Sequence, residues 1–496
     1  MKQSIEINQF GKNVGYVIIG NIVTTILIFL QIPILTRGLG PAAYGNWSLI
    51  NVTISLLTPF AMLAFNASII RFLAVEEDNS KIREDFFSAC AIVALLGIAL
   101  SALLFLFSGL MAKTIFGDVK LASVIKLSSV LILLNALYPL LTSFFSMKRN
   151  IGLYSIFNTC YSIFLTGLMF VFILSGQKLT GVITACIISL AVADILAFFI
   201  ILKQIGFHLP RFSNIRPYLK YGLPLVGSPA ILWIIYASDR YLISYFLGAA
   251  ATGIYSAAFG VGGYANFILP SVGIVLFPTI SKLFDEGDFD STKLYMKYTF
   301  KYLMMVIIPG AAGLSILGKQ LLRIIATPAF VNGSIIVPFI AFGSVFNCFY
   351  QICIYVMHLS RNTYINVRLL VTAAVVNVLL NLLLIPLMGI IGSAVASLVA
   401  FGTLGGLTWI ISRRYFKFDI SPSFILKSFF SASIMTVCIW LIKPESIYQV
   451  AVAIIIGIIV YFAVLVLIRG FSRQEFSFFT SFIRNTFKRN RRANTN

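Results

Sequence analysis

The sequence contains one pattern twice, and the two copies lie 208 residues apart. Residues 39–48 read LGPAAYGNWS and residues 247–256 read LGAAATGIYS, so six of the ten positions are identical. A second match has the same offset, because residues 181–190 correspond to residues 389–398. Self-similarity at a fixed spacing indicates duplicated structural units, so we expect two related halves.

A third match lies between these two in each half. It pairs Asn135-x-x-Tyr138 with Asn347-x-x-Tyr350, at an offset of 212. Three separate matches at nearly one offset are difficult to obtain by chance. In a membrane protein, two homologous halves around one central site are typical of an alternating-access transporter.

The composition requires a lipid bilayer around the chain. Hydrophobic residues make up 59% and charged residues 11% of the 496 residues, whereas charged residues make up about 25% of an ordinary soluble protein. We therefore predict an all-α polytopic membrane protein with about 14 transmembrane helices, six in each half and two more at the C-terminal end. The predicted spans are 14–35, 45–65, 86–108, 121–145, 154–175, 180–202, 221–245, 253–279, 296–318, 335–357, 365–386, 390–411, 424–442 and 449–469.

These spans give a domain organisation. We expect an N-terminal lobe in residues 1–203, a C-terminal lobe in residues 204–412 and two additional helices in residues 413–470. Residues 471–496 form a basic tail that either lies as a short helix on the anionic inner leaflet or is disordered. Six spans per half is an even number, so both halves enter the membrane in the same direction.

The basic residues predict the orientation. When each of the 37 lysines and arginines is assigned to its nearer side, nine lie opposite the N-terminus and 28 lie on its side. Cytoplasmic loops carry the excess of basic residues, so both termini are predicted to be cytoplasmic. Most of the formal charge of +21 is this topology signal, and it is weak support for nucleic-acid binding.

Catalytic and cofactor motifs are missing from the sequence. The two histidines are too far apart for a metal site, and the six cysteines show no C-x-x-C spacing. We expect no enzyme activity and no cofactor. Without a nucleotide-binding motif, transport has to draw on ion gradients, on the membrane potential or on substrate gradients.

Two acidic residues fall inside apolar spans, where a charge costs roughly 2.5–3.5 kcal/mol. Asp239 precedes Arg240 near the outer end of the seventh span, and the repeat places it opposite Gln31. It either forms half of a buried ion pair or binds a coupling cation or substrate hydroxyls. Asp194 in the sixth span has either a functional role or a helix–helix hydrogen bond.

Arginines lie at the ends of several spans. The predicted cytoplasmic ends carry Arg71, Arg149, Arg361 and Arg368, and the outer end of the first span carries Arg37. Guanidinium groups bind phosphate and pyrophosphate oxygens, so such a ring would suit an anionic lipid headgroup. Ordinary anchoring by cytoplasmic basic residues explains each of them equally well. Arg149 and Arg361 recur beside asparagine, which favours a structural role in turns.

Amide and aromatic side chains also occur within the spans, and this combination suits carbohydrate. Amides and hydroxyls satisfy sugar hydroxyls, and aromatic rings stack on sugar faces, although interhelical hydrogen bonding explains any single asparagine as well. The candidates are Asn21, Asn135, Asn347, Asn377, Asn381, Tyr138, Tyr236, Tyr264, Tyr350 and Trp233.

Two segments resemble a known family. Residues 33–45 (PILTRGLGPAAYG) look like the first-helix signature of Wzx-type polysaccharide flippases, in the multidrug/oligosaccharidyl-lipid/polysaccharide exporter superfamily. Residues 238–241 (SDRY), followed by residues 247–256, resemble the seventh and eighth helices of the same family. The resemblance extends over nearly the whole chain.

The resemblance implies two six-helix lobes related by a pseudo-twofold axis, as in MATE transporters. It implies translocation of an undecaprenyl-pyrophosphate-linked oligosaccharide across a bacterial cytoplasmic membrane, coupled to H⁺ or Na⁺, for O-antigen, capsule or exopolysaccharide synthesis. Membrane lipids and a glycan polymerase are the implied partners. Arg37, Asp239 and Arg240 carry over from the matching motifs as candidate cavity or gating residues.

Three alternatives stay open. A peptidoglycan-precursor flippase shares the fold, but the glycine-rich first loop of that relative reads differently. A multidrug/cation antiporter would favour an acidic cluster, whereas this chain has two isolated membrane acids. A glycan polymerase or ligase would need a large outer loop, and the longest one here is residues 319–334.

Overall fold

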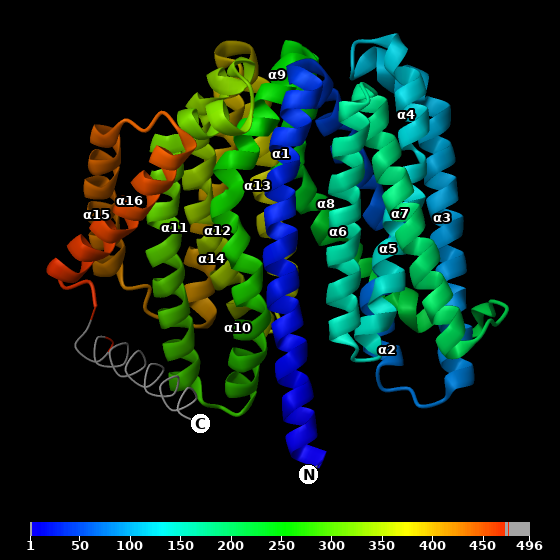
Figure 1. Ribbon diagram of the computed structural model, residues 1–496. Helices are drawn as coiled ribbons and strands as arrows, with labels where there is room; N and C mark the ends of the chain where they lie inside the picture. Colours follow the sequence, from blue (N-terminus) through cyan, green and yellow to red (C-terminus); the bar gives the residue numbers. More distant parts are fainter. Residues whose placement is uncertain (1, 472–474, 476–496) are drawn as a thin grey trace, which may run out of the picture. The chain divides into compact units, whose positions relative to one another are not determined.

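The computed structural model describes residues 2–471 and residue 475, and every regular element among them is a helix (Figure 1). Most of the predicted tail, residues 472–474 and 476–496, lies outside the described residues. The α-helices are α1 (Lys2–Met62), α2 (Phe65–Leu73), α3 (Asn79–Thr114), α4 (Ala122–Ser128), α5 (Val130–Met147), α6 (Ile151–Leu174), α7 (Lys178–Ile205), α8 (Ile215–Ala237), α9 (Asp239–Gly263), α10 (Ile268–Asp285), α11 (Phe289–Ile325), α12 (Val337–Leu359), α13 (Thr363–Met388), α14 (Ile390–Tyr415), α15 (Pro422–Ile442) and α16 (Ile447–Leu467). Short 3₁₀ helices cover Val119–Leu121, Phe212–Asn214, Tyr264–Phe267 and Pro328–Ile336.

Twelve helical segments among the described residues are long and apolar enough to cross a membrane. Two of them, Ile19–Leu73 and Phe212–Asn266, are 55 residues long. A crossing takes about 20 residues, so each of these two segments can cross twice. The count is therefore compatible with the fourteen spans predicted.

The repeat is visible in the backbone. Gly40 interrupts α1 with φ 73° and ψ 173°, and Gly248 interrupts α9 with φ 83° and ψ 175°. Both values of φ favour glycine, which explains why these two positions are identical in the two copies. Arg149 (φ 58°) and Arg361 (φ 57°) also share a left-handed conformation, in agreement with their predicted place in turns.

The third sequence match has a structural explanation. The hydroxyl of Tyr138 donates a hydrogen bond to Asn158 Oδ1 at 3.0 Å, and the hydroxyl of Tyr350 donates to Asn366 Oδ1 at 3.0 Å. Each bond joins two consecutive helices of its own half. These tyrosines therefore brace neighbouring helices, a role that the sequence raised as an alternative only for the asparagines.

Contacts divide the chain into two compact units. In the first unit, α1 packs along α5 and α6, and α6 packs against α7; in the second, α15 packs against α16. The predicted lobe boundary at residue 203 remains a prediction. The first unit consists of Met1–Phe259, Ile325–Ile336 and Leu370–Ala400, and the second of Gly260–Ile324, Val337–Leu369 and Phe401–Asn496.

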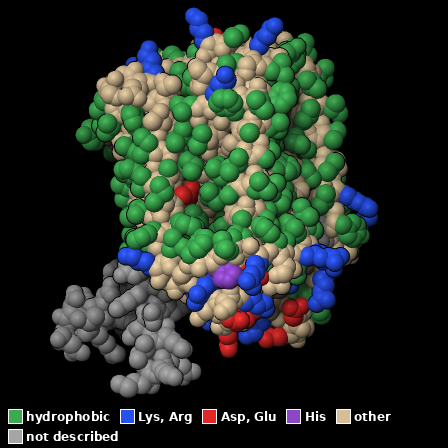
Figure 2. Space-filling view, turned by 90° about the vertical axis from the view of Figure 1, so that its right-hand side faces the viewer, with side chains coloured by type: hydrophobic (Ala, Val, Ile, Leu, Met, Phe, Trp, Pro, Cys, Tyr) green, Lys and Arg blue, Asp and Glu red, His purple; other side chains and the backbone are tan. Residues whose placement is uncertain are grey.

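The surface fits a protein surrounded by lipid. Figure 2 shows a face on which hydrophobic side chains form a broad band, with lysines and arginines gathered above and below it. Lipid tails cannot solvate charges, so a spanning protein is expected to have such a band.

A third buried acid adds to the two predicted. Asp85 is only 2% exposed in α3, and its Oδ2 accepts a hydrogen bond from the Tyr218 hydroxyl of α8 at 2.8 Å. The sequence placed Asp85 just before the predicted span 86–108, whereas α3 begins at Asn79. The predicted span 86–108 therefore begins too late, because the helix already includes Asp85.

Candidate functional site

A small polar cavity lies within the first unit, between α1 and the junction of α8 with α9. Its volume is about 260 Å³. Hydroxyl, amide, indole and guanidinium groups face it, although the surrounding helices are mostly apolar. The lining residues are Tyr44, Trp47, Ser48, Asn51, Val52, Tyr236, Ala237, Arg240 and Ser256.

A direct backbone contact between the two copies of the repeat adjoins the cavity. A Cβ atom added at Gly45 would collide with the carbonyl oxygen of Ala249, and one added at Gly253 would collide with that of Pro41. The contact is reciprocal, since the residue pairs are related by the offset of 208. One turn further on, the hydroxyls of Ser48 and Ser256 lie 2.7 Å apart in a hydrogen bond.

This contact explains the identity of the two copies. Only glycine lets the two backbones approach so closely, and the paired serines satisfy each other's hydroxyls at the cavity wall. The identical glycines and serines therefore hold the two helices together, and the paired serines also line the cavity beside Tyr44 and Trp47, whose positions differ between the copies.

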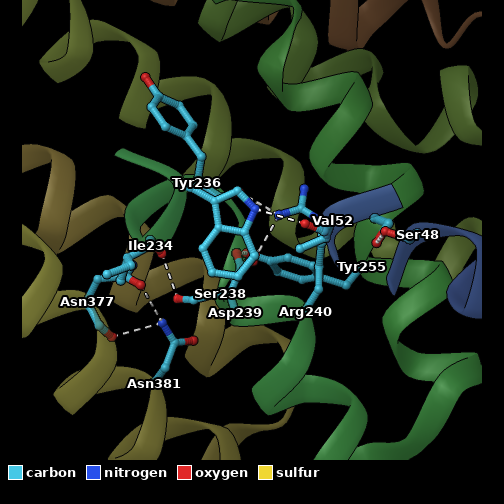
Figure 3. Close-up of polar contacts among 12 residues, drawn as sticks. Ser48, Val52, Ile234, Tyr236, Ser238, Asp239, Arg240, Tyr255, Asn377 and Asn381 are labelled. Atoms are coloured by element: carbon cyan, nitrogen blue, oxygen red, sulfur yellow. Dashed lines mark hydrogen bonds and ion pairs between the residues drawn. The ribbon is translucent and has the colours of Figure 1, made fainter. Parts of the chain in front are cut away.

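Asp239 and Arg240 form a buried ion pair at the start of α9 (Figure 3). Arg240 Nη1 lies 2.9 Å from Asp239 Oδ1, and the hydroxyl of Tyr255 donates to Asp239 Oδ2 at 2.5 Å. Arg240 Nη1 also donates to the Tyr236 carbonyl oxygen at 2.5 Å. The guanidinium lies over the ring of Phe259, 4.4 Å from its centroid.

The geometry separates the roles of the two charged residues. Asp239 is 0% exposed, and both of its oxygens are occupied, so a cation would have to displace a partner. Arg240 is 9% exposed and lines the cavity. Among the described contacts its hydrogen bonds use Nη1 alone, which leaves Nε and Nη2 for a ligand. The position of Asp239 therefore favours a role as half of a buried ion pair. The position of Arg240 favours direct contact with a ligand in the cavity.

Further contacts hold α8 and α9 against α1. The indole N–H of Trp233 donates to the Val52 carbonyl oxygen at 3.0 Å and to Ser55 Oγ at 3.1 Å. The hydroxyls of Thr53 and Tyr241 are 2.5 Å apart. Trp233, a predicted carbohydrate residue, thus uses its N–H group to fix the wall of the cavity.

The predicted amide residues lie elsewhere. Gln31 donates to Thr166 Oγ1 of α6 at 3.0 Å, and Asn135 donates to the Leu131 carbonyl oxygen at 2.8 Å. In the second unit, Asn347 donates to Asn266 Oδ1 at 2.9 Å. The bonds of Gln31 and Asn347 join different helices, whereas the bond of Asn135 lies within α5. None of these three residues lines the cavity described above.

Two asparagines of α13 form a separate buried pair. Asn377 and Asn381 are both 0% exposed, and Asn381 Nδ2 donates to the Asn377 carbonyl oxygen at 2.9 Å (Figure 3). The same nitrogen lies 3.2 Å from Asn377 Oδ1. The pair is intrahelical, and neither asparagine lines the polar cavity.

The remaining predicted arginines do not line the polar cavity. Arg37 is exposed on α1. Arg71 lies 4.6 Å from the ring centroid of Tyr221, and Arg368 lies 5.1 Å from that of Tyr364. The structure therefore brings together only Arg240 and Asp239 from the predicted charged residues, and the anion-binding role of the others remains a prediction.

Asp194 is a buried acid with an unusual environment. It is 6% exposed in α7, and neither carboxylate oxygen has a hydrogen-bond partner among the described residues. The hydroxyl of Ser189 on the same helix is also unpaired there. The helix–helix hydrogen bond, one of the two alternatives for Asp194, is thus not formed within the described part of the chain.

Several cavity residues were not predicted as site residues. Tyr44, Trp47 and Ser48 lie in the first copy of the repeat, and Ser256 lies in the second. In the sequence these positions indicate the duplication, but nothing about them indicates a cavity. Asn51 carried no signal, although its position one helical turn after Trp47 places it on the same face.

Comparison with known proteins identifies relatives. The model of the family described as "Polysaccharide biosynthesis protein" matches residues 10–284. A membrane protein of Methanocaldococcus jannaschii is 24% identical over 250 residues, 48% of this chain and 49% of that protein. The probable low-salt glycan biosynthesis flippase Agl15 of Haloferax volcanii is 21% identical over 275 residues, 54% of this chain and 57% of that protein.

A putative O-antigen transporter of Shigella flexneri is also similar, with 22% identity over 288 residues, 56% of this chain and 68% of that protein. The chain spans about half the length of the first two relatives.

Solved structures share the fold. The lipid II flippase MurJ in an inward closed conformation has a TM-score of 0.72 and 19% identity, over 91% of this chain and 98% of that one. An inward-facing multidrug MATE transporter has a TM-score of 0.70 and 13% identity, over 79% of this chain and 94% of that one. The predicted MATE-like helical fold is confirmed.

Proposed function

Because this chain belongs to the polysaccharide biosynthesis protein family, we propose that it is a flippase for an undecaprenyl-pyrophosphate-linked oligosaccharide. It would carry the oligosaccharide from the inner to the outer leaflet of a bacterial cytoplasmic membrane by alternating access. The names of two relatives support this class of substrate, since one is a glycan biosynthesis flippase and one a transporter of O-antigen.

The polar cavity is the observation that carries the proposal. Trp47 and the tyrosines at its wall offer rings for sugar faces, and Ser48, Asn51 and Ser256 offer groups for sugar hydroxyls. A sugar headgroup is the part of the substrate that most needs such a polar path, because the hydrocarbon core solvates hydroxyls poorly. The polyprenyl tail would remain in the lipid.

Arg240 is the proposed ligand-binding cation of this cavity. Its pairing with Asp239 gives the two residues no net charge, so the cavity offers hydrogen-bond donors to sugar oxygens without holding a strongly attracted anion. Asp239 and Tyr255 would act as positioning residues that fix the guanidinium at the cavity wall. A site that binds moderately suits transport, since the substrate has to leave again.

For energy coupling we favour H⁺ over Na⁺, and Asp194 as the group that carries it. A buried carboxylate without a hydrogen-bond partner is stable when it is protonated, because the charged form is poorly solvated.

The orientation completes the proposal. The excess of basic residues on the side of the N-terminus supports cytoplasmic termini. A glycan polymerase on the outer face would then receive the translocated oligosaccharide.

Deletion of the gene in its host tests this function. We expect loss of surface glycan together with accumulation of lipid-linked oligosaccharide on the inner leaflet, and rescue by the wild-type gene. Arg240→Gln should fail to rescue, whereas Arg216→Gln, which changes an exposed arginine outside the cavity, should rescue fully. Normal glycan with altered resistance to cationic drugs would contradict the proposal and favour the antiporter.

A further inference from the structure

A second cavity, lined mainly by basic side chains, lies at the C-terminal end of α14 in the second unit. Its volume is about 540 Å³, and Ile410, Arg413, Arg414 and Lys417 line it. Three of these four side chains are cations. Among the described residues none of the three forms an ion pair. The C-terminus of a helix carries roughly half a negative charge, which offsets only part of three positive charges.

The nearest acid in the sequence does not neutralise this cavity. Asp419 Oδ2 lies 2.7 Å from Lys297 Nζ, and Asp419 Oδ1 accepts a hydrogen bond from the Ser421 backbone N–H at 2.8 Å. The bond from Lys297 holds the pKa of Asp419 below its usual range, so the carboxylate stays ionised beside that lysine. Acids also lie near Phe284 and Phe289, which pack against Phe416. Two of these acids are paired elsewhere: Glu286 lies 3.8 Å from Lys282, and Asp290 lies 3.0 Å from Lys293. None of the described ion pairs involves the three cations of the cavity, so an external anion can bind them.

Aromatic packing holds the cavity in place on both sides. The Arg413 guanidinium lies 5.3 Å from the ring centroid of Trp409. Beyond the helix end, the ring of Phe416 packs against those of Phe284 at 5.6 Å and Phe289 at 6.2 Å. The backbone that carries Arg413 and Lys417 is therefore anchored, so binding of a ligand to these exposed side chains does not have to order the backbone.

The surroundings indicate an anion that is attached to lipid. Ile410 is 51% exposed and gives the cavity an apolar side, and tryptophan such as Trp409 is enriched at the membrane interface. A soluble anion would make no use of this apolar side. Arginine and lysine clusters at the ends of membrane helices bind acidic headgroups.

We propose that Arg413, Arg414 and Lys417 bind the phosphate of an acidic phospholipid in the bilayer leaflet that they face. The two guanidiniums would grip the phosphate oxygens, Lys417 would add a third charge, and an acyl chain would run along Ile410. This lipid site is separate from the polar cavity and does not depend on the proposed transport function.

Native mass spectrometry of the purified full-length protein tests the proposal. The protein is titrated with phosphatidylglycerol and, separately, with phosphatidylcholine of the same acyl chains. We expect the wild type to retain one phosphatidylglycerol preferentially. Since each basic residue near an anionic surface contributes about a fivefold factor, the triple variant Arg413→Gln/Arg414→Gln/Lys417→Gln should lose at least tenfold in affinity for it. The single variant Arg414→Gln should show part of this loss and gives the same test if the triple variant folds poorly.

A matched control removes three exposed basic residues of the first unit in the variant Lys148→Gln/Lys203→Gln/Arg216→Gln. It should bind phosphatidylglycerol as the wild type does. Equal losses of phosphatidylglycerol affinity in both triple variants would overturn the proposal, because they would show that binding depends only on the net charge of the protein. Displacement of the lipid by millimolar inorganic phosphate or pyrophosphate would show that the cavity binds a soluble anion. That result would overturn the proposal of a phospholipid ligand.

Discussion

The two copies of the repeat keep the same contact and carry different chemistry. At the offset of 208, Gln31 and Ile32 of the first half, which precede the first copy, correspond to Asp239 and Arg240 of the second half. Gln31 donates a neutral hydrogen bond to Thr166, whereas Asp239 is held by a charged partner and a hydroxyl. The same backbone position thus carries an amide in one half and an ion pair in the other.

A second difference between the halves lies within the two copies of the repeat, at Trp47 and Tyr255. Trp47 of the first copy lines the polar cavity, whereas the equivalent Tyr255 is 0% exposed and points its hydroxyl to Asp239. The first half supplies Tyr44 and Trp47 to the cavity, and the second half supplies Tyr236 together with the charge and its support. Duplication preserved the scaffold, and divergence on this scaffold produced an asymmetric site.

Removal of the charge from the second copy should have the largest effect. Asp239→Ala leaves Arg240 buried without its partner, and breaking a buried pair costs about 3–5 kcal/mol. We expect a lower midpoint of thermal unfolding in detergent, with the protein still inserted, and loss of glycan export. The double variant Asp239→Ala/Arg240→Ala should be less destabilised than the sum of the two single variants. Unchanged unfolding of Asp239→Ala would contradict the importance of the pair.

The shared backbone contact should be next in sensitivity. Gly45→Ala and Gly253→Ala each place a methyl group against a carbonyl oxygen of the other copy, and overpacking of this kind costs about 1–3 kcal/mol. Both should reduce thermal stability and export to a similar extent. Gly167→Ala is the matched control, since nothing lies within 4 Å of its added Cβ. Equal tolerance of all three variants would show that the two backbones do not need this approach.

Substitution of the aromatic residue Trp47 in the first copy should weaken substrate binding more than it lowers the stability of the fold. Trp47→Ala removes a ring from the cavity wall, and a stacking contact is worth about 0.5–1.5 kcal/mol. Initial flipping rates in proteoliposomes should show an apparent KM raised a few-fold, with kcat less affected. Trp47→Phe should recover most of the loss. A lower kcat at constant KM would instead assign Trp47 to the conformational change.

The smallest effect should come from the paired serines. Ser48→Ala and Ser256→Ala each remove the same hydrogen bond, which is worth about 1 kcal/mol. The two substitutions should lower the unfolding midpoint equally, and the double variant should differ little from either single one. Additive losses would mean that each serine has a different partner.

The repeat and the apolar spans were sufficient to predict the fold. The offset of 208 between Gly40 and Gly248 reflects a backbone conformation that favours glycine in both halves. The chain also places long helices where the apolar stretches were found. The boundary at Asp85 was misplaced because hydropathy does not detect a buried acid whose partner, Tyr218, is distant in the sequence.

The candidate site was predictable only in part. Arg240 and Asp239 stood out because charges are rare in apolar spans, but their pairing with each other depends on side-chain directions that spacing does not determine. Asn51 and Trp47 line the cavity because α1 resumes after Gly40 at a new angle. That change of direction is a property of the tertiary structure.

Flipping by the purified protein in proteoliposomes is the most direct test of the central claim that the Arg240 cavity carries a lipid-linked glycan. The vesicles contain a polyprenyl-pyrophosphate-linked oligosaccharide, and an enzyme added outside reports how much of it reaches the outer leaflet. We predict that wild type and Arg216→Gln translocate the glycan and that Arg240→Gln loses at least tenfold in rate. Translocation by Arg240→Gln at the wild-type rate would contradict this account.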